Sequence, residues 1–244
     1  MSHYANILAL RGLYGTGHFT PRSWSDSSDH AYIGIHLIER SIAALAPKVG
    51  GEMIDIGCGR QPYRSYFTHL TRVVTCDHDA SRGSVDFACP AHAIPVADAS
   101  FDTVLCTEVL EHVPDPLAVW HEFYRILRPG GKVLLTTPMY WPEHETPYDF
   151  FRYPEHGLRH LAASSGFLVE ELWPRGGVWA LLGQVVIHVA GHYLPLPFMR
   201  SAWNRTMLAI DRRRVNPALT IGWTILATKC AAASNAALPA AANR

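Results

Sequence analysis

A short glycine-containing turn is the first feature of the sequence whose residue types could support chemistry. The segment Asp55-Ile56-Gly57-Cys58-Gly59 follows apolar residues, and Asp77 comes twenty positions after Gly57. Glycines allow a close backbone approach to a ligand, and the N–H groups after such a turn favour an anionic group. A carboxylate at the end of the next strand can accept hydrogen bonds from ribose hydroxyls. Pro62 replaces the third glycine of a dinucleotide fingerprint, which argues against a pyrophosphate ligand.

Two histidines that follow predicted strands are the candidate catalytic residues. His144 lies in a loop with Tyr140 and Trp141, and we expect it to act as a base or to contact the substrate. The alternative is a loop histidine that is bonded to Asp149 or to the backbone. His112 is the second catalytic candidate, with loop fixation by hydrogen bonding as its alternative role.

The same loop contains the candidate substrate residues, which are Tyr148, Asp149 and Arg152. Asp149 and Arg152 are three positions apart and could form a local ion pair. The spacing of His, Asp and Glu residues along the chain matches no metal-ligand pattern, so the sequence predicts no metal.

The elements that must position these residues alternate between strands and helices. Strands are expected over 52–56, 72–76, 84–89, 101–106, 132–136, 167–173 and 220–228. Helices are expected over 31–46, 62–70, 115–127 and 154–164, the third beginning with an Asp115 N-cap and Pro116. This alternation predicts an α/β fold with a parallel, doubly wound sheet.

Four stretches together resemble class I S-adenosylmethionine-dependent methyltransferases of the type 11 kind. They are the glycine turn, the segment from Ile94 to Leu105, the segment from Thr107 to Pro116 and the segment from Arg125 to Lys132. They cover roughly residues 50–138 in the family's order and spacing. The resemblance implies a Rossmann-like, seven-stranded sheet whose last strand is antiparallel, with a helical insertion before that strand. The segment from His144 to Arg152 resembles a smaller subgroup, some members of which are linked to glycan or cell-surface pathways.

The resemblance also implies roles for individual residues and S-adenosyl-L-methionine as the cofactor. Gly57, Cys58 and Gly59 would cradle its methionine part, and Asp55 would order the turn or reach the amino group. Asp77 would bind the ribose. The other implied cofactor contacts are His78, Ala91 and His92 near the adenine, and Thr107 and Glu108 on the methyl-transfer side.

The segment before the last strand is unusual in composition. Residues 178–199 contain no charged side chain, but Gln184, His188 and His192 recur every four residues and form a polar stripe on one helix face. Residues 175–214 hold six Arg and one Asp, so their net charge is 6 − 1 = +5. Four interpretations are open: a lid, a dimerisation helix, a peripheral membrane contact through 178–214 and a membrane span. The first two are favoured.

Composition sets the remaining limits. The 244 residues are 48% hydrophobic and 17% charged with zero net charge, which argues against disorder and against nucleic-acid binding. Five cysteines without a C-x-x-C pair are expected to be reduced, which predicts a cytoplasmic protein, with a peripheral position at the membrane as the alternative. We expect an irregular arm over 1–30, a methyltransferase domain over 31–229 with an insertion over about 175–218, and a disordered Ala-rich tail over 230–244.

The predicted function is methyl transfer to the oxygen of a small-molecule, glycan or lipid-linked acceptor, and an oligomer is possible. Two alternatives remain at this point. One is a catalytically inactive S-adenosylmethionine-binding partner protein, and the other is an NAD-dependent oxidoreductase.

Overall fold

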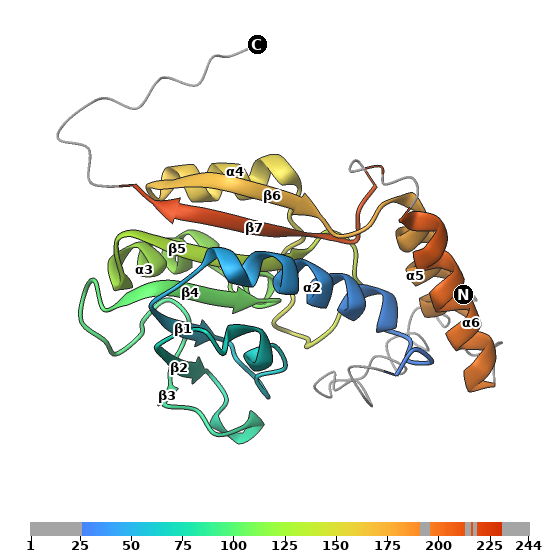
Figure 1. The fold of residues 1–244 in the computed structure, drawn as a ribbon, viewed down its shortest axis with the longest axis horizontal. Coiled ribbons are helices and arrows are strands. Elements are labelled where there is room, and N and C mark those ends of the chain that lie inside the picture. The colour runs from blue at the N-terminus through green and yellow to red at the C-terminus, as the bar shows by residue number, and fades with distance from the viewer. Residues whose placement is uncertain (1–25, 191–195, 213–215, 217–218, 231–244) are drawn as a thin grey trace, which may run out of the picture.

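A seven-stranded sheet forms the centre of the molecule (Figure 1). The computed structural model describes residues 26–190, 196–212, 216 and 219–230. The strand order is β3-β2-β1-β4-β5-β7-β6, and β7 runs antiparallel to both of its neighbours. The strands are β1 Glu52–Ile56, β2 Arg72–Asp77, β3 Phe87–Ala88, β4 Phe101–Thr107, β5 Leu127–Pro138, β6 Phe167–Pro174 and β7 Gly222–Lys229. The predicted Rossmann-like sheet with an antiparallel last strand is therefore confirmed.

Helices cover both faces of this sheet because its central strands bury side chains on both sides. Their bounds are α2 Tyr32–Leu45, α3 Pro116–Ile126, α4 Glu155–Ser164, α5 Val178–Ala190 and α6 Pro197–Asp211. On one face, α2 packs its Ile38, Ile42 and Leu45 against Leu105 and Leu134 of the sheet. The neighbouring sheet residues Val104, Cys106, Val133 and Leu135 point to the opposite face, where they pack with α3 and α4.

Three predicted elements differ from the structure. The helix expected over 62–70 is a short 3₁₀-helix, Arg64–Phe67, which follows Pro62. The strand expected over 84–89 pairs with β2 only at Phe87–Ala88. The Pro129-Gly130-Gly131 segment does not separate helix from strand, because β5 already begins at Leu127 and the register shifts between its first pair and the pair Thr103–Lys132.

The start of α3 agrees with the prediction. The Asp115 side chain accepts a hydrogen bond from the Ala118 N–H at 3.0 Å, and Pro116 is the first helical residue. Four of the five cysteines, Cys58, Cys76, Cys89 and Cys106, are buried thiols, and Cys230 is an exposed one. Residues 1–25 of the predicted arm and 231–244 of the predicted tail lie outside the described residues.

In its described residues, the predicted insertion before β7 contains two helices, α5 and α6, which pack on each other beyond the carboxyl ends of the parallel strands (Figure 1). The α5 N-terminus is capped by Asp211 of α6, which accepts hydrogen bonds from the Gly177 and Ala180 N–H groups. The polar stripe faces inward, because Gln184 is fully buried and His188 is 6% exposed. His192 lies outside the described residues. None of the described helices is both long and apolar enough to cross a membrane.

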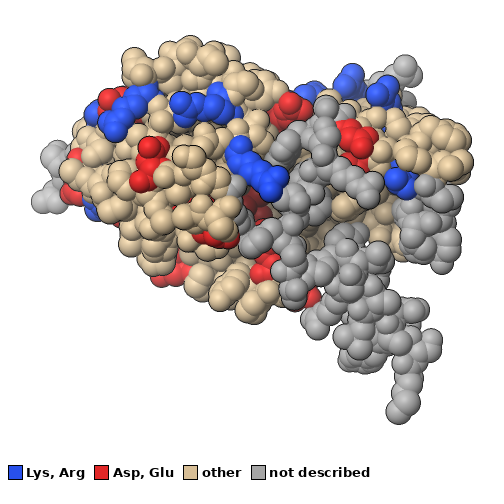
Figure 2. Space-filling model, turned by 90° about the horizontal axis from the view of Figure 1, so that it is seen from below, with Lys and Arg blue, Asp and Glu red and all other residues tan. Residues whose placement is uncertain are grey.

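The four described arginines of this insertion do not form one surface. Arg175 is 2% exposed, and Arg200 donates a hydrogen bond to the Ser28 carbonyl at 2.9 Å, whereas Arg205 and Arg212 are exposed. Figure 2 shows basic and acidic side chains interspersed among uncharged ones on the face in view. Part of the positive charge of residues 175–214, that of Arg175 and Arg200, therefore makes contacts within the fold.

Trp120 of α3 provides a test of the core. It is fully buried, and its ring meets Phe123 and Phe167 edge to face, with centroids 5.7 and 5.3 Å away. We expect Trp120→Ala to lower the free energy of unfolding by about 3–5 kcal/mol through the cavity that it leaves. Leu117→Ala on the same helix, where the side chain is 36% exposed, should cost less than about 1 kcal/mol. Denaturant titration of both variants measures the difference, and equal costs would contradict this account of the core.

Candidate functional site

A cavity of about 350 Å³ lies where the glycine turn after β1, the end of β4 and the loop after β5 meet. Its position at the carboxyl ends of parallel strands is where ligands bind in open α/β sheets. Its wall combines the apolar side chains of α2 with polar groups from the loops. Among its lining residues are Gly34, Ile35, Ile38, Gly57, Cys58, Gly59, Tyr63, Thr107, Glu108, Glu111, His112, Trp141, His144, Glu145 and Arg175.

The glycine turn is held tightly against the neighbouring strands. The Gly57 and Cys58 N–H groups both donate to the Cys76 carbonyl of β2, at 2.8 and 3.1 Å. Gly57 has a φ of +68°, and a Cβ at this position would lie 2.2 Å from Val109 Cγ2. Only glycine meets both requirements, so the turn can present its backbone to the cavity.

Asp77 lies beneath the turn rather than in the cavity wall. It is 2% exposed, and its Oδ2 accepts a hydrogen bond from the Gly59 N–H at 2.9 Å. Its Oδ1 accepts a second bond from the Asp79 N–H at 3.0 Å and lies 3.2 Å from His78 Nδ1. Each carboxylate oxygen can accept more than one hydrogen bond, so Asp77 can order the turn and still meet a ligand hydroxyl.

Asp55 is also buried under the turn. It is 5% exposed, and its Oδ1 has no hydrogen-bond partner in the described part of the chain. Burial is the main cause that raises the pKa of Asp55, to about 7. A nearby cation would favour the ionised carboxylate.

Glu108 and Arg175 form an ion pair at the cavity, 3.0 Å apart between Glu108 Oε1 and Arg175 Nη2. Arg175 Nη2 also donates to the Thr137 carbonyl at the end of β5, at 2.5 Å. Arg175 is the residue that follows β6 and is 2% exposed. Its contacts therefore hold the end of β6 close to the ends of β4 and β5. The buried positive charge of Arg175 is thus neutralised by Glu108, another residue of the cavity wall.

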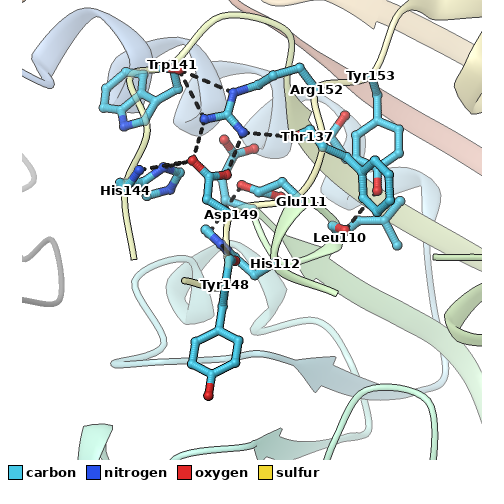
Figure 3. Close-up of polar contacts among 12 residues, drawn as sticks. Leu110, Glu111, His112, Thr137, Trp141, His144, Tyr148, Asp149, Arg152 and Tyr153 are labelled. Atoms are coloured by element: carbon cyan, nitrogen blue, oxygen red, sulfur yellow. Dashed lines mark hydrogen bonds and ion pairs between the residues drawn. The ribbon is translucent and has the colours of Figure 1, made fainter. Parts of the chain in front are cut away.

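Glu111, His112 and His144 gather on the other side of the cavity (Figure 3). The two imidazole rings meet edge to face with centroids 4.6 Å apart. Glu111 is 1% exposed, and neither of its carboxylate oxygens has a hydrogen-bond partner among the described residues. Burial, and then the nearby Glu108, raise the pKa of Glu111 well above its ordinary value.

His144 is held by its own loop. Its backbone N–H donates to Asp149 Oδ2 at 3.0 Å, and its Nδ1 lies 3.3 Å from the same oxygen. Arg152 donates hydrogen bonds of 2.6 and 2.8 Å to the Asp149 carboxylate, and it donates another to the Trp141 carbonyl. Burial would raise the pKa of Asp149, but the bonds from Arg152 and from the His144 N–H hold it below its usual value. Burial, and then the neighbouring His112, lower the pKa of His144.

The insertion supports this loop through the buried stripe of α5. Gln184 accepts a hydrogen bond from the Gly34 N–H at 3.1 Å, and its Nε2 lies 2.7 Å from His188 Nε2. The His188 ring in turn meets the Trp141 ring edge to face, with centroids 4.7 Å apart. Burial lowers the pKa of His188 to about 3, so the ring is neutral near pH 7. Trp141, a wall of the cavity, is therefore positioned by α5.

The structure separates the predicted site residues into three groups. The cavity brings together the predicted cofactor residues Gly57, Cys58, Gly59, Thr107 and Glu108 with the predicted catalytic residues His112 and His144. Asp55 and Asp77 lie under the turn. The lining of the cavity does not include the remaining predicted residues, which are His78, Ala91, His92, Tyr148, Asp149 and Arg152.

The three predicted substrate residues lie beside the cavity and make other contacts. Tyr148 is 64% exposed with its ring directed away from the cluster, and only its carbonyl takes part, by accepting a bond from His112 Nδ1 at 2.7 Å (Figure 3). Asp149 and Arg152 form the predicted local ion pair and support His144. The loop-fixing alternatives for His112 and His144 thus describe contacts that are present, and both rings still face the cavity.

Four charged residues of the cavity lining were not predicted as site residues, and one of them, Arg60, directly follows the glycine turn. Glu111 belongs to a segment that carries the family resemblance, but its burial depends on how β4 and the loop after β5 pack. Arg175 follows β6, about 67 residues after its partner Glu108. Glu145 follows the candidate base directly. Adjacency to a motif could have indicated Glu111 and Glu145, whereas no local pattern indicates Arg175.

Comparison with known families decides the type of domain. Residues 54–135 match the family model described as a methyltransferase domain. This segment is a class I methyltransferase domain. The match contains the glycine turn, Asp77, β4 and most of β5, and S-adenosylmethionine is the cofactor of the domain.

Curated relatives match the same part of the chain. A ubiquinone biosynthesis O-methyltransferase of Xanthomonas oryzae pv. oryzae is 32% identical over 111 residues, which are 39% of this chain and 46% of that protein. A probable S-adenosylmethionine-dependent methyltransferase of Mycolicibacterium smegmatis is 31% identical over 138 residues, which are 50% of this chain and 54% of that protein. The chain spans about half the length of the curated relatives it matches.

Solved structures share the fold at low sequence identity. The [4+2]-cyclase SpnF has a TM-score of 0.59 and 16% identity, with 94% of each chain covered. A putative sarcosine dimethylglycine methyltransferase from Galdieria sulphuraria has a TM-score of 0.55 and 15% identity, with 93% of this chain and 97% of that chain covered. These likenesses concern the fold alone, because one fold supports different chemistries.

The methyltransferase domain should bind S-adenosylhomocysteine and should not bind NAD. Asp77→Ala leaves the Gly59 N–H without its acceptor and removes a candidate partner of the ribose, so we expect binding of S-adenosylhomocysteine to weaken by about 1–3 kcal/mol. Titration calorimetry measures both ligands. Asp98→Ala, a change of an acidic side chain that is 78% exposed, is the control and should leave the dissociation constant unchanged. An equal dissociation constant for Asp77→Ala would move the ribose contact elsewhere.

Proposed function

We propose that this protein transfers a methyl group from S-adenosylmethionine to a hydroxyl oxygen of its acceptor. One observation supports the choice of oxygen: His112 and His144 lie in the wall of the same cavity as the glycine turn of the methyltransferase domain. Histidine is the usual general base near neutral pH, and a hydroxyl needs to lose its proton as it attacks.

Methyl transfer mainly requires the protein to align the acceptor with the methyl donor. The sulfonium of S-adenosylmethionine is already an activated methyl donor, and displacement requires the acceptor oxygen in line behind the methyl carbon. Holding the two reactants in one cavity can supply up to about 7–11 kcal/mol of the barrier reduction. Thr107 and Glu108, at the end of β4, are suited to the methyl-transfer side, and His144 is suited to accept the proton.

The acceptor class follows from the surroundings of this cavity. Apolar walls from α2 and Trp141 suit a small molecule or the lipid part of a linked acceptor, and the Xanthomonas relative is named an O-methyltransferase of ubiquinone biosynthesis. The resemblance of the segment from His144 to Arg152 keeps a glycan acceptor in the proposal. Cytoplasmic location and the boundaries of the arm, domain and tail remain predictions.

One alternative has a specific observation in its favour. Asp149 and Tyr148 already engage both candidate bases, which is compatible with a chain that binds the cofactor without turnover as part of a complex. An NAD-dependent oxidoreductase is disfavoured by the match to the methyltransferase family model.

Activity should depend on His144 in a defined pH range. A base must be neutral to accept a proton, and because the pKa of His144 is lowered, the neutral form should persist below pH 6.5. We expect the rate to stay level from pH 7.5 to about 6.5 and to fall only at lower pH. His112→Ala removes one cause of the lowered pKa and should shift this decline to higher pH. The rate is measured with methyl-labelled S-adenosylmethionine and a panel of phenols, glycans and prenylated phenols.

The matched control is His160→Ala, because His160 is an exposed histidine of α4 outside the cavity lining. His144→Ala should lower the rate about 10²–10⁴-fold, while His160→Ala should leave it unchanged. Binding of S-adenosylhomocysteine without label transfer to any acceptor of the panel would favour the inactive partner instead.

We further propose that α5 and α6 contact a membrane surface or a lipid-linked acceptor at its periphery. The outward sides of these helices expose large apolar side chains: Trp179 is 38%, Leu182 45%, Val189 57% and Phe198 69% exposed. Arg205 and Arg212 of the same insertion are exposed, and such a combination favours anionic lipid surfaces. A lid or a dimer contact are the other occupants of this surface.

Vesicle co-sedimentation distinguishes these occupants. We expect the protein to sediment with vesicles that contain anionic phospholipid, and we expect a Leu182→Ser/Val189→Ser/Phe198→Ser variant to stay in the supernatant. Leu168→Ser is the control, because this β6 side chain is 63% exposed but lies outside the insertion. Absence of wild-type sedimentation, together with a concentration-dependent dimer that the triple variant loses, would assign the surface to a second copy of the chain.

A further inference from the structure

Glu111 is the least explained polar side chain of the cavity. It is 1% exposed, and no described residue donates a hydrogen bond to either of its oxygens. Its shortest ion-pair distance is 3.7 Å, from Oε1 to His112 Nε2. A buried carboxylate without partners is costly, and such groups in native proteins are usually paired or hold a cation. The side chain lines the cavity, so a ligand within the cavity could satisfy it.

His112 and His144 are arranged in the same way around this carboxylate. Each uses Nδ1 for an oxygen outside the cluster: the Tyr148 carbonyl at 2.7 Å for His112, and the Pro142 carbonyl at 3.2 Å for His144. If Nδ1 carries the proton in both rings, Nε2 carries the lone pair in both. This tautomer is the one that metal-bound histidines adopt when a carbonyl or a carboxylate fixes their other nitrogen.

The support extends one layer further for His144. Asp149 Oδ2 lies 3.3 Å from His144 Nδ1, and Arg152 holds this carboxylate with two bonds. The carboxylate behind the histidine and the arginine behind the carboxylate fix the orientation of the ring. The same arrangement is what the outer shell of a metal site provides.

The geometry points to a divalent transition-metal site made by Glu111, His112 and His144. One ligand atom from each residue lies within 4.8 Å of the other two. Ligands of a tetrahedral ion with bonds of about 2.1 Å lie about 3.4 Å apart, so the group needs to close by little more than about 1 Å. Two nitrogens and one carboxylate suit Zn²⁺ and its neighbours rather than Mg²⁺ or Ca²⁺, which prefer oxygen ligands.

This inference is opposite to the expectation from sequence spacing, for a physical reason. Glu111 and His112 follow β4, whereas His144 follows β5, so 32 residues separate the last two ligands along the chain. Local spacing cannot show a ligand set that forms only because β4 and β5 are adjacent in the sheet. The fold, not the motif, brings the three side chains together.

The site deepens the proposed methyl transfer and rests on it for its chemical purpose. An acceptor hydroxyl that occupies an open position of the ion would lose its proton to solvent more readily, because the cation stabilises the alkoxide or phenolate. The ionised oxygen then bonds to the methyl carbon, the carbon–sulfur bond breaks and its electron pair stays on sulfur. In this case His144 holds the ion and does not itself accept the proton.

Metal binding is tested first without any acceptor. Protein stripped with a chelator and dialysed is titrated with ZnCl₂ by calorimetry, and Co²⁺ absorption reports the coordination. We expect one tight ion per chain in the wild type. Glu111→Gln and His144→Ala should each weaken this event at least 100-fold, and Asp149→Asn, which removes no ligand but weakens the support of His144, should weaken it about 10–100-fold. His160→Ala should leave it unchanged, which separates the site from weak binding by the other histidines.

Folding and function are kept separate from this result. Each variant must still bind S-adenosylhomocysteine, which shows that the domain is folded. Absence of a stoichiometric event in the wild type, or an unchanged event in both Glu111→Gln and His144→Ala, would overturn the metal site. Methyl transfer that is unaffected by the chelator would also overturn its catalytic purpose and leave His144 as the direct base, whereas a metal-binding protein without any methyl transfer would overturn the proposed function alone.

Discussion

The ion pair between Asp149 and Arg152 is the constraint on which the loop after β5, and with it one side of the cavity, depends. The loop from Met139 to Tyr153 has no helix or strand of its own, so its backbone needs side chains to fix it. Arg152 reaches across the loop to the Trp141 carbonyl, and Asp149 binds the His144 N–H. Because the Asp149 side chain is 3% exposed, removing Arg152 would leave a buried charge behind, and the loop would lose its single arrangement.

The loop that this pair fixes contacts the rest of the molecule on two sides. Towards the sheet, the Glu111 carbonyl accepts hydrogen bonds from the Phe150 and Phe151 N–H groups, which ties the loop to the short 3₁₀-helix Leu110–His112 after β4. Towards the insertion, Trp141 rests against His188 of α5 and so close to Gly34 that a Cβ there would lie 2.9 Å from its ring. The helices of the insertion consequently support Trp141, a residue of the cavity wall, and their outward face is the part left for contacts with other molecules.

The sequence was sufficient for the features that depend on neighbours along the chain. The glycine turn, the Asp115 cap and the Asp149–Arg152 pair are local, and the structure confirms them. Features that depend on packing were not predictable in the same way. The start of β5 at Leu127 depends on pairing with Phe101, and the burial of Gln184 and His188 depends on Gly34 and Trp141.

The cavity shows why the turn alone does not decide what the domain does. A cyclase and a methyltransferase share this fold at similar TM-scores, so the sheet and the turn fix where a cofactor can lie but not which bond changes. The difference has to arise from the groups that face the cofactor across the cavity. Here these groups are two histidines with their Nδ1 atoms engaged and a buried carboxylate with no hydrogen-bond donor among the described residues. Such a set interacts with an anionic oxygen only once a proton or a cation completes it, so the chemistry of the cavity depends on the residues that follow β4 and β5 and not on the fold alone.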